Sequence, residues 1–552
     1  EINMKTFNIK IWAIAAISLV LTGTSCTSDL DKEPISPKID TAYSSDGLFN
    51  KCYANFAMAG SGNGDNGDAG SDVKGYSDEG MTNLYRLMWN ANELTTDEAI
   101  CGWGDNGLDQ LVVNTYDNSN QMMKAYFSRL TIGISTCNQY IAVAGQEDAT
   151  KTAEVRFLRA LQYYILMDAF GNVPFSETLS KPVRYTRAEM FDWLVKELTE
   201  NVEPNLADAH AKTSADAGYG RVDKAAAWLL LARLYLNAEV YTGTAQWENA
   251  KTWANKVIAS DYKLNKTGIG NWSAYQMLFM GDNGETSAAK EAIFPIIQNS
   301  KDIRSYGNSL FLMASTFNDK MHANPDDASA INGCVSAAWG GNRARMELVR
   351  KFFPTGDVPK AKSYEMPALA NDKRAIFWGY SDDEADPVTL ENTKISNFKS
   401  GYAVCKFVNF KTDGSSAYNP SFADADCFFM RAAEAYLIVG EADARLHGNQ
   451  TTAEGTKAID ELRDRAKATT RGETGSYSLN EICDEWAREF YFEGIRRPTL
   501  IRFGRFGGNN NYNWSWKGNA ETGKNFDSHL NIFPIPVGEL NANSNLKQNP
   551  GY

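Results

Sequence analysis

The stretch from Arg221 to Ala238, RVDKAAAWLLLARLYLNA, constrains the fold more than any other part of the chain. At helical spacing its apolar residues surround the axis almost completely. A helix that is apolar nearly all round is stable when other elements cover it on most sides. Its run of three alanines allows a neighbouring helix to approach closely. The sequence therefore predicts a mainly α protein in which this helix lies buried between others.

Further helices are predicted on both sides of this one. Glu154 to Asp168 carries apolar residues on one face at helical spacing. The other predicted helices are Gln246 to Ile258, Phe429 to Leu446, Thr452 to Ala468, and Ile482 to Gly494, the last of which should end at its glycine. Neighbouring members form antiparallel pairs that resemble tetratricopeptide units, although no strict repeat period can be aligned.

The helix pairs are separated by a long segment of different composition. Residues 265–428 are richer in Gly, Asn, Asp and Ser and lack long helical periodicity. We expect an irregular, loop-rich insertion that packs on a helical scaffold made of about 41–260 and 428–552. Residues 41–552 would then form a single globular unit. Binding residues concentrate in loops that a rigid scaffold positions, so the insertion is a candidate for function.

The N-terminal segment predicts export and a lipid anchor. Residues 1–25 contain two lysines and then the apolar run Ile11 to Leu21, which is too short to cross a bilayer and is typical of a signal peptide. The small residues Gly23, Thr24 and Ser25 precede Cys26, as in a bacterial lipobox. We expect lipidation at Cys26, an acidic tether over 26–40, and display on the outer face of the cell outer membrane. The alternative is ordinary secretion with cleavage nearby.

Charge and composition exclude several classes of function. A net charge of −13 and a pI near 5.1 argue against nucleic-acid binding. The eight cysteines form no C-x-x-C pair, and the four histidines form no H-E-x-x-H helix. We expect the cysteines to be buried as small apolar residues, while a disulfide between two of them stays open.

One glycine-rich stretch imitates two ligand-binding motifs. Gly62 to Gly67 fits G-x-G-x-x-G, but no predicted strand precedes it and no helix follows, so a surface loop is favoured over a dinucleotide site. Asp65, Asp68 and Asp72 hint at calcium, but the acidic residue that an EF-hand requires at its last position is absent.

No catalytic constellation stands out. The chain lacks a G-x-S-x-G elbow. Its 68 Asp and Glu residues could supply the paired carboxylates of a glycoside hydrolase, yet nothing selects one pair. The residues themselves thus provide no positive evidence for an enzyme.

Three aromatic residues in polar loops are more informative. Trp103 and Trp339 both lie beside glycines, and Tyr306 lies in Arg-Ser-Tyr-Gly-Asn. An exposed ring can stack on the C–H face of a sugar while Asn, Asp and Arg bind the hydroxyls around its rim. The alternative is that these rings fasten their loops to the core. Their shared Gly- and Asn-rich context favours ligand contact.

Five segments, in order along the chain, resemble the SusD/RagB family of outer-membrane nutrient-binding lipoproteins. The segments are Glu154 to Phe175, Gly220 to Tyr235, Arg431 to Arg445, Trp486 to Gly504, and Phe533 to Tyr552. The resemblance implies four tetratricopeptide-like helix pairs that support an irregular ligand face. It also implies a SusC-like TonB-dependent outer-membrane transporter as partner, an oligosaccharide or polysaccharide ligand, and no catalytic activity.

The binding residues of the family's starch-binding member resemble residues of this chain. The resemblance implies that one glycan site is formed by Asp78, Arg86, Trp103, Asn106, Tyr306 and Trp339. It departs at Cys101, where that member has a second tryptophan. The implied ligand is an α-glucan such as starch or a maltooligosaccharide, and the departure leaves another neutral glycan open.

Two alternative functions remain, and the ligands of one cofactor are not assigned. A surface glycoside hydrolase and a tetratricopeptide-type scaffold for a protein partner are the alternatives from other functional classes. Some members of the family bind calcium structurally, but the sequence alone assigns no calcium ligands here. We expect no other cofactor.

Overall fold

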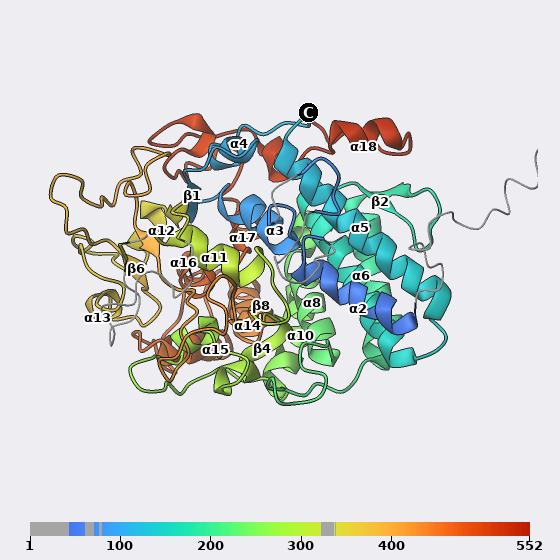
Figure 1. Ribbon diagram of the computed structural model, residues 1–552, viewed down its shortest axis with the longest axis horizontal. Helices are drawn as coiled ribbons and strands as arrows, with labels where there is room; N and C mark the ends of the chain where they lie inside the picture. The colour runs from blue at the N-terminus through green and yellow to red at the C-terminus, as the bar shows by residue number, and fades with distance from the viewer. Residues whose placement is uncertain (1–43, 61–70, 77–79, 319, 322–335, 337) are drawn as a thin grey trace, which may run out of the picture. The chain divides into compact units, whose positions relative to one another are not determined.

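Helix α8 lies among other helices, as its apolar sequence predicts. In the computed structural model α8 (Lys224–Leu236) packs against α10 (Trp247–Ala259) and α14 (Ala433–Leu446) (Figure 1). The side chain of Asp223 accepts a hydrogen bond from the Ala225 N–H and caps the helix. Since α14 follows the insertion in sequence, this contact joins the two parts of the helical scaffold.

The structure describes residues 44–60, 71–76, 80–318, 320–321, 336 and 338–552. Residues 48–552 form one compact unit. The mainly helical class and the single globular unit predicted from sequence are confirmed. No helix in the described ranges is both long enough and apolar enough to cross a membrane.

Long helices occur before the insertion and after it. The helices not yet given are α2 (Ser45–Ala57), α3 (Leu84–Glu93), α4 (Leu108–Val112), α5 (Gln121–Ala144), α6 (Ala149–Phe170), α7 (Arg187–Lys196), α9 (Ala238–Thr242), α11 (Asn308–Thr316), α12 (Met346–Arg350), α13 (Met366–Leu369), α15 (Ala453–Arg465), α16 (Leu479–Phe490), α17 (Arg496–Arg502) and α18 (Val537–Ala542). Short 3₁₀ or π turns are η1 (Glu197–Val202), η2 (Glu203–Asn205), η3 (Gln276–Phe279), η4 (Ser287–Glu291), η5 (Lys517–Asn519) and η6 (Ser528–Asn531).

Strands are short and pair two by two, always antiparallel. The pairs are β1 (Ala99–Cys101) with β5 (Asn342–Ala344), β2 (Val173–Phe175) with β3 (Val183–Tyr185), β4 (Ala292–Ile296) with β8 (Cys427–Arg431), and β6 (Phe377–Trp378) with β7 (Ala403–Val404). The β1–β5 and β4–β8 pairs attach the insertion to the scaffold, because each joins segments more than 130 residues apart.

Two of the helix boundaries that differ from the sequence prediction have a clear structural cause. Phe429 to Arg431 forms the end of β8 rather than the start of a helix, because this segment pairs with β4 and is buried. Helix α16 ends at Phe490, four residues before the predicted stop at Gly494. Phe492 and Gly494 both adopt positive φ, at 64° and 80°, and turn the chain there.

One hydrophobic core extends through the scaffold and the insertion. The Trp89 ring of α3 lies 5.4 Å from Phe311 of α11 and 5.2 Å from Phe492, centroid to centroid. These three rings come from the first part of the scaffold, the insertion and the last part. The six cysteines in the described ranges are buried and free, as the sequence predicts.

Candidate functional site

The β1–β5 pair brings the two predicted tryptophans together. Cys101 is paired with Asn342, and the Gly102 N–H donates to the Gly341 carbonyl at 3.1 Å. Trp103 and Trp339 therefore lie just beyond the ends of two paired strands. Their ring centroids are 6.2 Å apart at an interplanar angle of 58°, and both side chains are half-buried.

A glycine makes this pairing possible. A Cβ atom on Gly341 would lie only 2.1 Å from Cε2 of Trp103. The Trp103 Nε1–H in turn donates to the Trp339 carbonyl at 3.4 Å. The two rings are thus held by the backbone of the loop before β5, and each still has part of its surface open to solvent.

The guanidinium of Arg86 packs against the ring of Trp103. Its guanidinium lies 5.6 Å from the Trp103 ring centroid and 5.1 Å from that of Phe311. Its Nη2 donates to Asp105 at 3.3 Å. Only 5% of Arg86 is exposed, so most of its surface serves to position the loop. Its role as a direct ligand of sugar hydroxyls stays a prediction.

The N-terminus of α3 fixes Arg86 and connects it to Tyr306. Asn83 caps the helix by accepting from the Arg86 N–H, and the same oxygen accepts from the Asn308 N–H. Tyr306 precedes that contact by two residues, is half-buried, and packs 5.2 Å from Phe422. It therefore borders the helix end that carries Arg86.

The remaining predicted residues divide into exposed and undescribed ones. Asn106 is exposed at the tip of the turn before α4, next to Asp105. Asp78, Cys26 and the motif Gly62 to Gly67 lie outside the described residues. Asp105 was missed by sequence reasoning, although its place two residues after Trp103 could have suggested it.

Cys101 contributes no binding surface. Its side chain is 2% exposed within β1, and burial raises the pKa of its thiol to about 12. Cys101 stands where the family's starch-binding member has a second tryptophan, and in this chain that position faces the interior. We call Arg86, Trp103, Asp105 and Trp339 the aromatic site.

Burial also argues against a catalytic role for Glu93 and Glu98, a carboxyl pair whose pKa values are raised. Burial raises the pKa of Glu98 to about 7, and burial followed by the charge of Glu98 raises that of Glu93. A raised carboxyl pKa is typical of a general acid. However, Glu93 and Glu98 are 0% and 1% exposed. They bind the backbone N–H groups of Gly494 and Phe492 instead, so their role is structural.

One polar cavity is lined by carboxylate oxygens, which calcium prefers as ligands. The cavity has a volume of about 540 Å³, and Asp282, Asp424 and Asp426 line it. Asp282 is 7% exposed, and its Oδ1 has no hydrogen-bond partner in the described part of the chain. Its Oδ2 accepts from Thr412. In the same described part, no three His, Cys, Asp or Glu side chains gather to hold a metal. A calcium ion here would therefore also need carbonyl or water ligands, which it accepts.

Comparison with known proteins places the chain among one group of relatives. Residues 240–552 match the model of the SusD family. The chain is 36% identical to the starch-binding protein SusD of Bacteroides thetaiotaomicron over the full length of both. It is 25% identical to the SusD-like protein P2 of Formosa agariphila over 79% of this chain and 82% of that one.

Solved structures show the same fold at low sequence identity. A SusD superfamily protein from Parabacteroides distasonis has a TM-score of 0.63 at 18% identity, over 92% of this chain and 98% of that chain. Surface glycan-binding protein A from Bacteroides thetaiotaomicron, solved with laminarihexaose, has a TM-score of 0.62 at 16% identity and the same coverage.

Proposed function

The chain belongs to the SusD family, and from that premise we propose that it captures a glycan at the cell surface and delivers it to a SusC-like TonB-dependent transporter. The observation that carries the proposal is the tilted pair of half-exposed indoles, Trp103 and Trp339, 6.2 Å apart at the rim of two paired strands. As a member of a family of binding proteins, the chain is not an enzyme.

The aromatic site matches the chemistry of a sugar ring. The C–H faces of a pyranose bury apolar surface against indole, while its hydroxyls exchange water for protein partners. Each such exchange contributes on the order of 1 kcal/mol, because the hydroxyl was already hydrogen-bonded to water. Two indoles must therefore act together, and we propose that Tyr306, Asn106 and Asp78 add further contacts.

We propose an α-glucan such as starch as the ligand, by analogy with the relative that is 36% identical. Because Cys101 is buried and offers no platform, affinity for starch should be micromolar or weaker, about −8 kcal/mol at best. The second candidate is another neutral glycan. This alternative is kept because a protein of the same fold was solved with laminarihexaose.

Affinity electrophoresis in gels containing amylopectin, dextran, pullulan or laminarin tests the proposal. Wild type should be retarded by at least one of the three α-glucans. Trp103→Ala and Trp339→Ala should each weaken retention more than tenfold, whereas Trp253→Ala on α10 should not change it. Retention by laminarin alone would replace the α-glucan by another glycan. Unchanged retention of the double variant would show that the aromatic site is misplaced.

Two assays address the alternative functions. Release of reducing sugar from the retained glycan would indicate a hydrolase, and we expect none. A failure to bind every glycan, together with capture of a protein partner, would favour a tetratricopeptide-type scaffold instead.

We propose that the chain is lipid-anchored through Cys26 at the outer face of the outer membrane. The support is the small-residue tripeptide before Cys26 and the family membership. A fatty-acid analogue should label wild type and not Cys26→Ala. Affinity purification from outer membranes should recover a TonB-dependent barrel with the wild type. Equal labelling of both proteins would exclude the anchor.

We further propose a structural calcium ion beside Asp282. The support is the buried, unpartnered Oδ1 of that residue in a cavity that Asp424 and Asp426 also line. When bound, the ion would neutralise the charge of the buried Asp282 carboxylate, with carbonyl or water oxygens as its further ligands. Asp282→Asn should melt at the same temperature with calcium and with chelator, while wild type should melt several degrees higher with calcium. An identical wild-type melt under both conditions would exclude the ion.

A further inference from the structure

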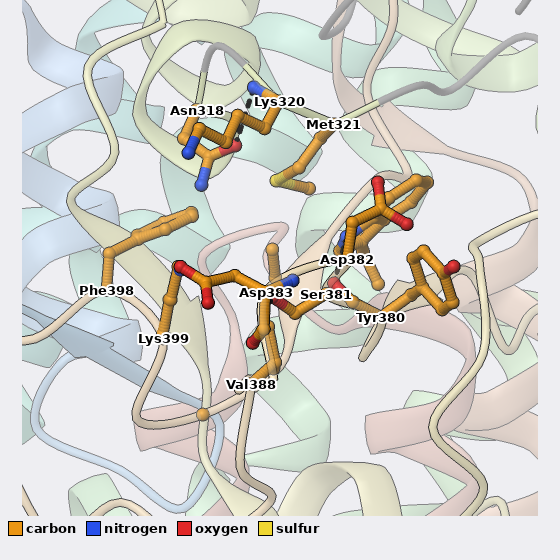
Figure 2. Close-up of a pocket in the computed structure, with 13 residues that line it drawn as sticks. Asn318, Lys320, Met321, Tyr380, Ser381, Asp382, Asp383, Val388, Phe398 and Lys399 are labelled. Atoms are coloured by element: carbon orange, nitrogen blue, oxygen red, sulfur yellow. Dashed lines mark hydrogen bonds between the residues drawn. The ribbon is translucent and has the colours of Figure 1, made fainter. Parts of the chain in front are cut away.

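A second cavity opens between loops of the insertion. It has a volume of about 290 Å³, and the described residues that line it come from three segments: Asn318 with Lys320 and Met321, residues 378–388, and residues 398–403. Figure 2 shows Phe398 and Tyr380 on opposite sides of it, with Asn318 and Lys320 along a third side. None of these residues was singled out by the sequence.

This cavity begins one residue away from the aromatic site. Gly340, which follows Trp339, lies between two residues of the cavity wall. A Cβ atom on it would be 3.8 Å from Cγ of Phe398 and 3.9 Å from Cβ of Asn318. On the other side, a Cβ on Gly102 would be 3.0 Å from the carbonyl oxygen of Ile395. The segment that carries Phe398 thus packs beside the neighbours of both tryptophans.

The interior of the cavity is apolar and its rim is polar. Met321, Val388 and Trp378 are buried in its wall, and Phe398 and Tyr380 are partly exposed. Apolar surface of this kind suits the C–H face of a sugar.

The rim carries groups that can bind hydroxyls. Asp382 and Asp383 are exposed there, and a hydrogen bond to Asp382 raises the pKa of Tyr380. The lining residues that the structure describes include Lys320 and Lys399 as well as Asp382 and Asp383. Lys399 is already paired with Asp386, so the described rim carries no excess of positive charge. A neutral ligand is favoured over a uronic acid or a sulfated sugar.

The wall is held in place before any ligand arrives. The Trp378 Nε1–H donates to the Tyr380 carbonyl at 2.8 Å. Lys399 binds the Asp386 carboxylate at 2.7 Å and its carbonyl at 3.0 Å. Lys362 covers one face of Tyr380, with Nζ 5.0 Å from the ring centroid. Preorganised walls reduce the entropy lost on binding.

We propose that this cavity binds one further neutral sugar unit of the same glycan that the aromatic site holds. The cavity is at the lower end of the size range of ligand pockets, so it admits a single unit and not a chain. Its position makes the site longer than the aromatic pair and selects glycans that extend past Trp339. The proposal rests on the proposed glycan-binding function.

Isothermal titration with short and long oligosaccharides tests this extension. The probes are maltotriose and maltoheptaose, with laminaritriose and laminarihexaose as the β-linked pair. Phe398→Ala should weaken binding of the longer member of the bound pair about tenfold and leave the trisaccharide within twofold of wild type. Asp382→Ala, which removes an exposed rim carboxylate and its hydrogen bond with Tyr380, should weaken binding of the longer sugar severalfold. Trp339→Ala should lose both lengths.

Controls separate the possible failures. Tyr418→Ala removes an aromatic side chain that is 74% exposed and lines a different cavity, and it should bind like wild type. If wild type binds the longer sugar, Trp339→Ala does not, and Phe398→Ala and Asp382→Ala both match wild type, the extension is wrong and the proposed function stands. If wild type binds no probe, both are overturned. A matching thermal melt verifies that each variant is folded.

Discussion

At the scale of single residues, the glycines beside the tryptophans act differently from what their sequence context suggests. The glycine-rich sequence around Trp103 and Trp339 favours contact of the rings with a ligand. In the structure, Gly341 provides the space into which the edge of Trp103 packs, while nothing lies within 4 Å of a Cβ placed on Gly104. One glycine is therefore needed for the geometry of the aromatic site and the other is not.

This difference predicts unequal effects of the same substitution. Gly341→Ala would push a methyl group into the Trp103 ring and tilt it, so glycan affinity should fall at least tenfold. Gly104→Ala should change affinity less than twofold. Titration of both variants with the retained glycan measures the effect, and equal affinities would contradict the packing role of Gly341.

Glu98 gives a second residue-scale prediction, concerning pH. Burial raises its pKa to about 7 in the folded protein, from an ordinary value of 4.5. Between pH 4.5 and about 7, Glu98 is therefore protonated in the folded protein and ionised in the unfolded chain. The stability contribution is fully present below pH 4.5 and is lost as the pH rises through 7, on the order of 3 kcal/mol in all.

Glu98→Gln should remove the part of this dependence that comes from Glu98, while Glu93, whose pKa burial also raises, keeps its own. The amide oxygen can still accept from the Phe492 N–H, but the side chain no longer titrates. Urea unfolding at pH 5 and pH 8 should show wild type losing more stability over the interval than the variant. Parallel losses in both proteins would mean that Glu98 is not protonated in the fold.

At the scale of elements, α8 packs closely against α10 and α14. Ala225, Ala227 and Ala232 are fully buried there. The Arg233 guanidinium of α8 forms an ion pair with Glu434 of α14, 2.5 Å between Nε and Oε1, across 201 residues of sequence. Both small side chains and a buried charge pair thus specify how these two helices meet.

Ala232→Leu should destabilise the protein because no space is left for the larger side chain. Overpacking of a dense core costs ~1–3 kcal/mol. Ala142→Leu on α5 is the matched control, since Ala142 is exposed within a helix. Chemical denaturation should show a loss for Ala232→Leu alone, and two equally stable variants would contradict the tight contact.

At the scale of the whole molecule, a buried ionic network ties the insertion to the scaffold. Glu489 of α16 accepts from Arg374 in the insertion at 3.2 Å and from Arg431 of β8 at 2.7 Å, and it also pairs with Arg465 of α15. Burial by itself would raise the pKa of Glu489, but these guanidinium groups lower it to about 2. The network resists separation of the parts that it joins.

Glu489→Gln should therefore destabilise the described unit as a whole. The variant leaves three buried guanidinium groups with fewer carboxylate partners, since of the described residues only Asp372, Glu485, Glu291 and Glu493 still pair with them. Loss of one partner of a buried ion pair costs up to about 3–5 kcal/mol. Calorimetry should show a single transition at lower temperature. The control Glu200→Gln on the exposed surface should melt like wild type. Two separate transitions in wild type would contradict the single unit.

Several long helices and the family could be predicted from the sequence alone, whereas α3, α5 and α7 were not predicted. Apolar periodicity depends on nearest neighbours along one helix, so α6, α8, α10 and α15 could be predicted from local residues. The aromatic residues of the candidate site were also found from sequence, because their loop context is local and resembles that of the family.

The strands, the geometry of the two indole rings and the second cavity depend on contacts between distant segments, and they became evident only in the folded structure. Phe429 to Arg431 is a strand because β4, more than 130 residues earlier, forms backbone hydrogen bonds with β8. Trp103 meets Trp339 because β1 pairs with β5 across more than 230 residues, and Phe398 reaches the same place from a third segment. Contacts between distant segments leave no periodic signal in either one, since each residue's partner is chosen by the fold and not by its neighbours in the chain.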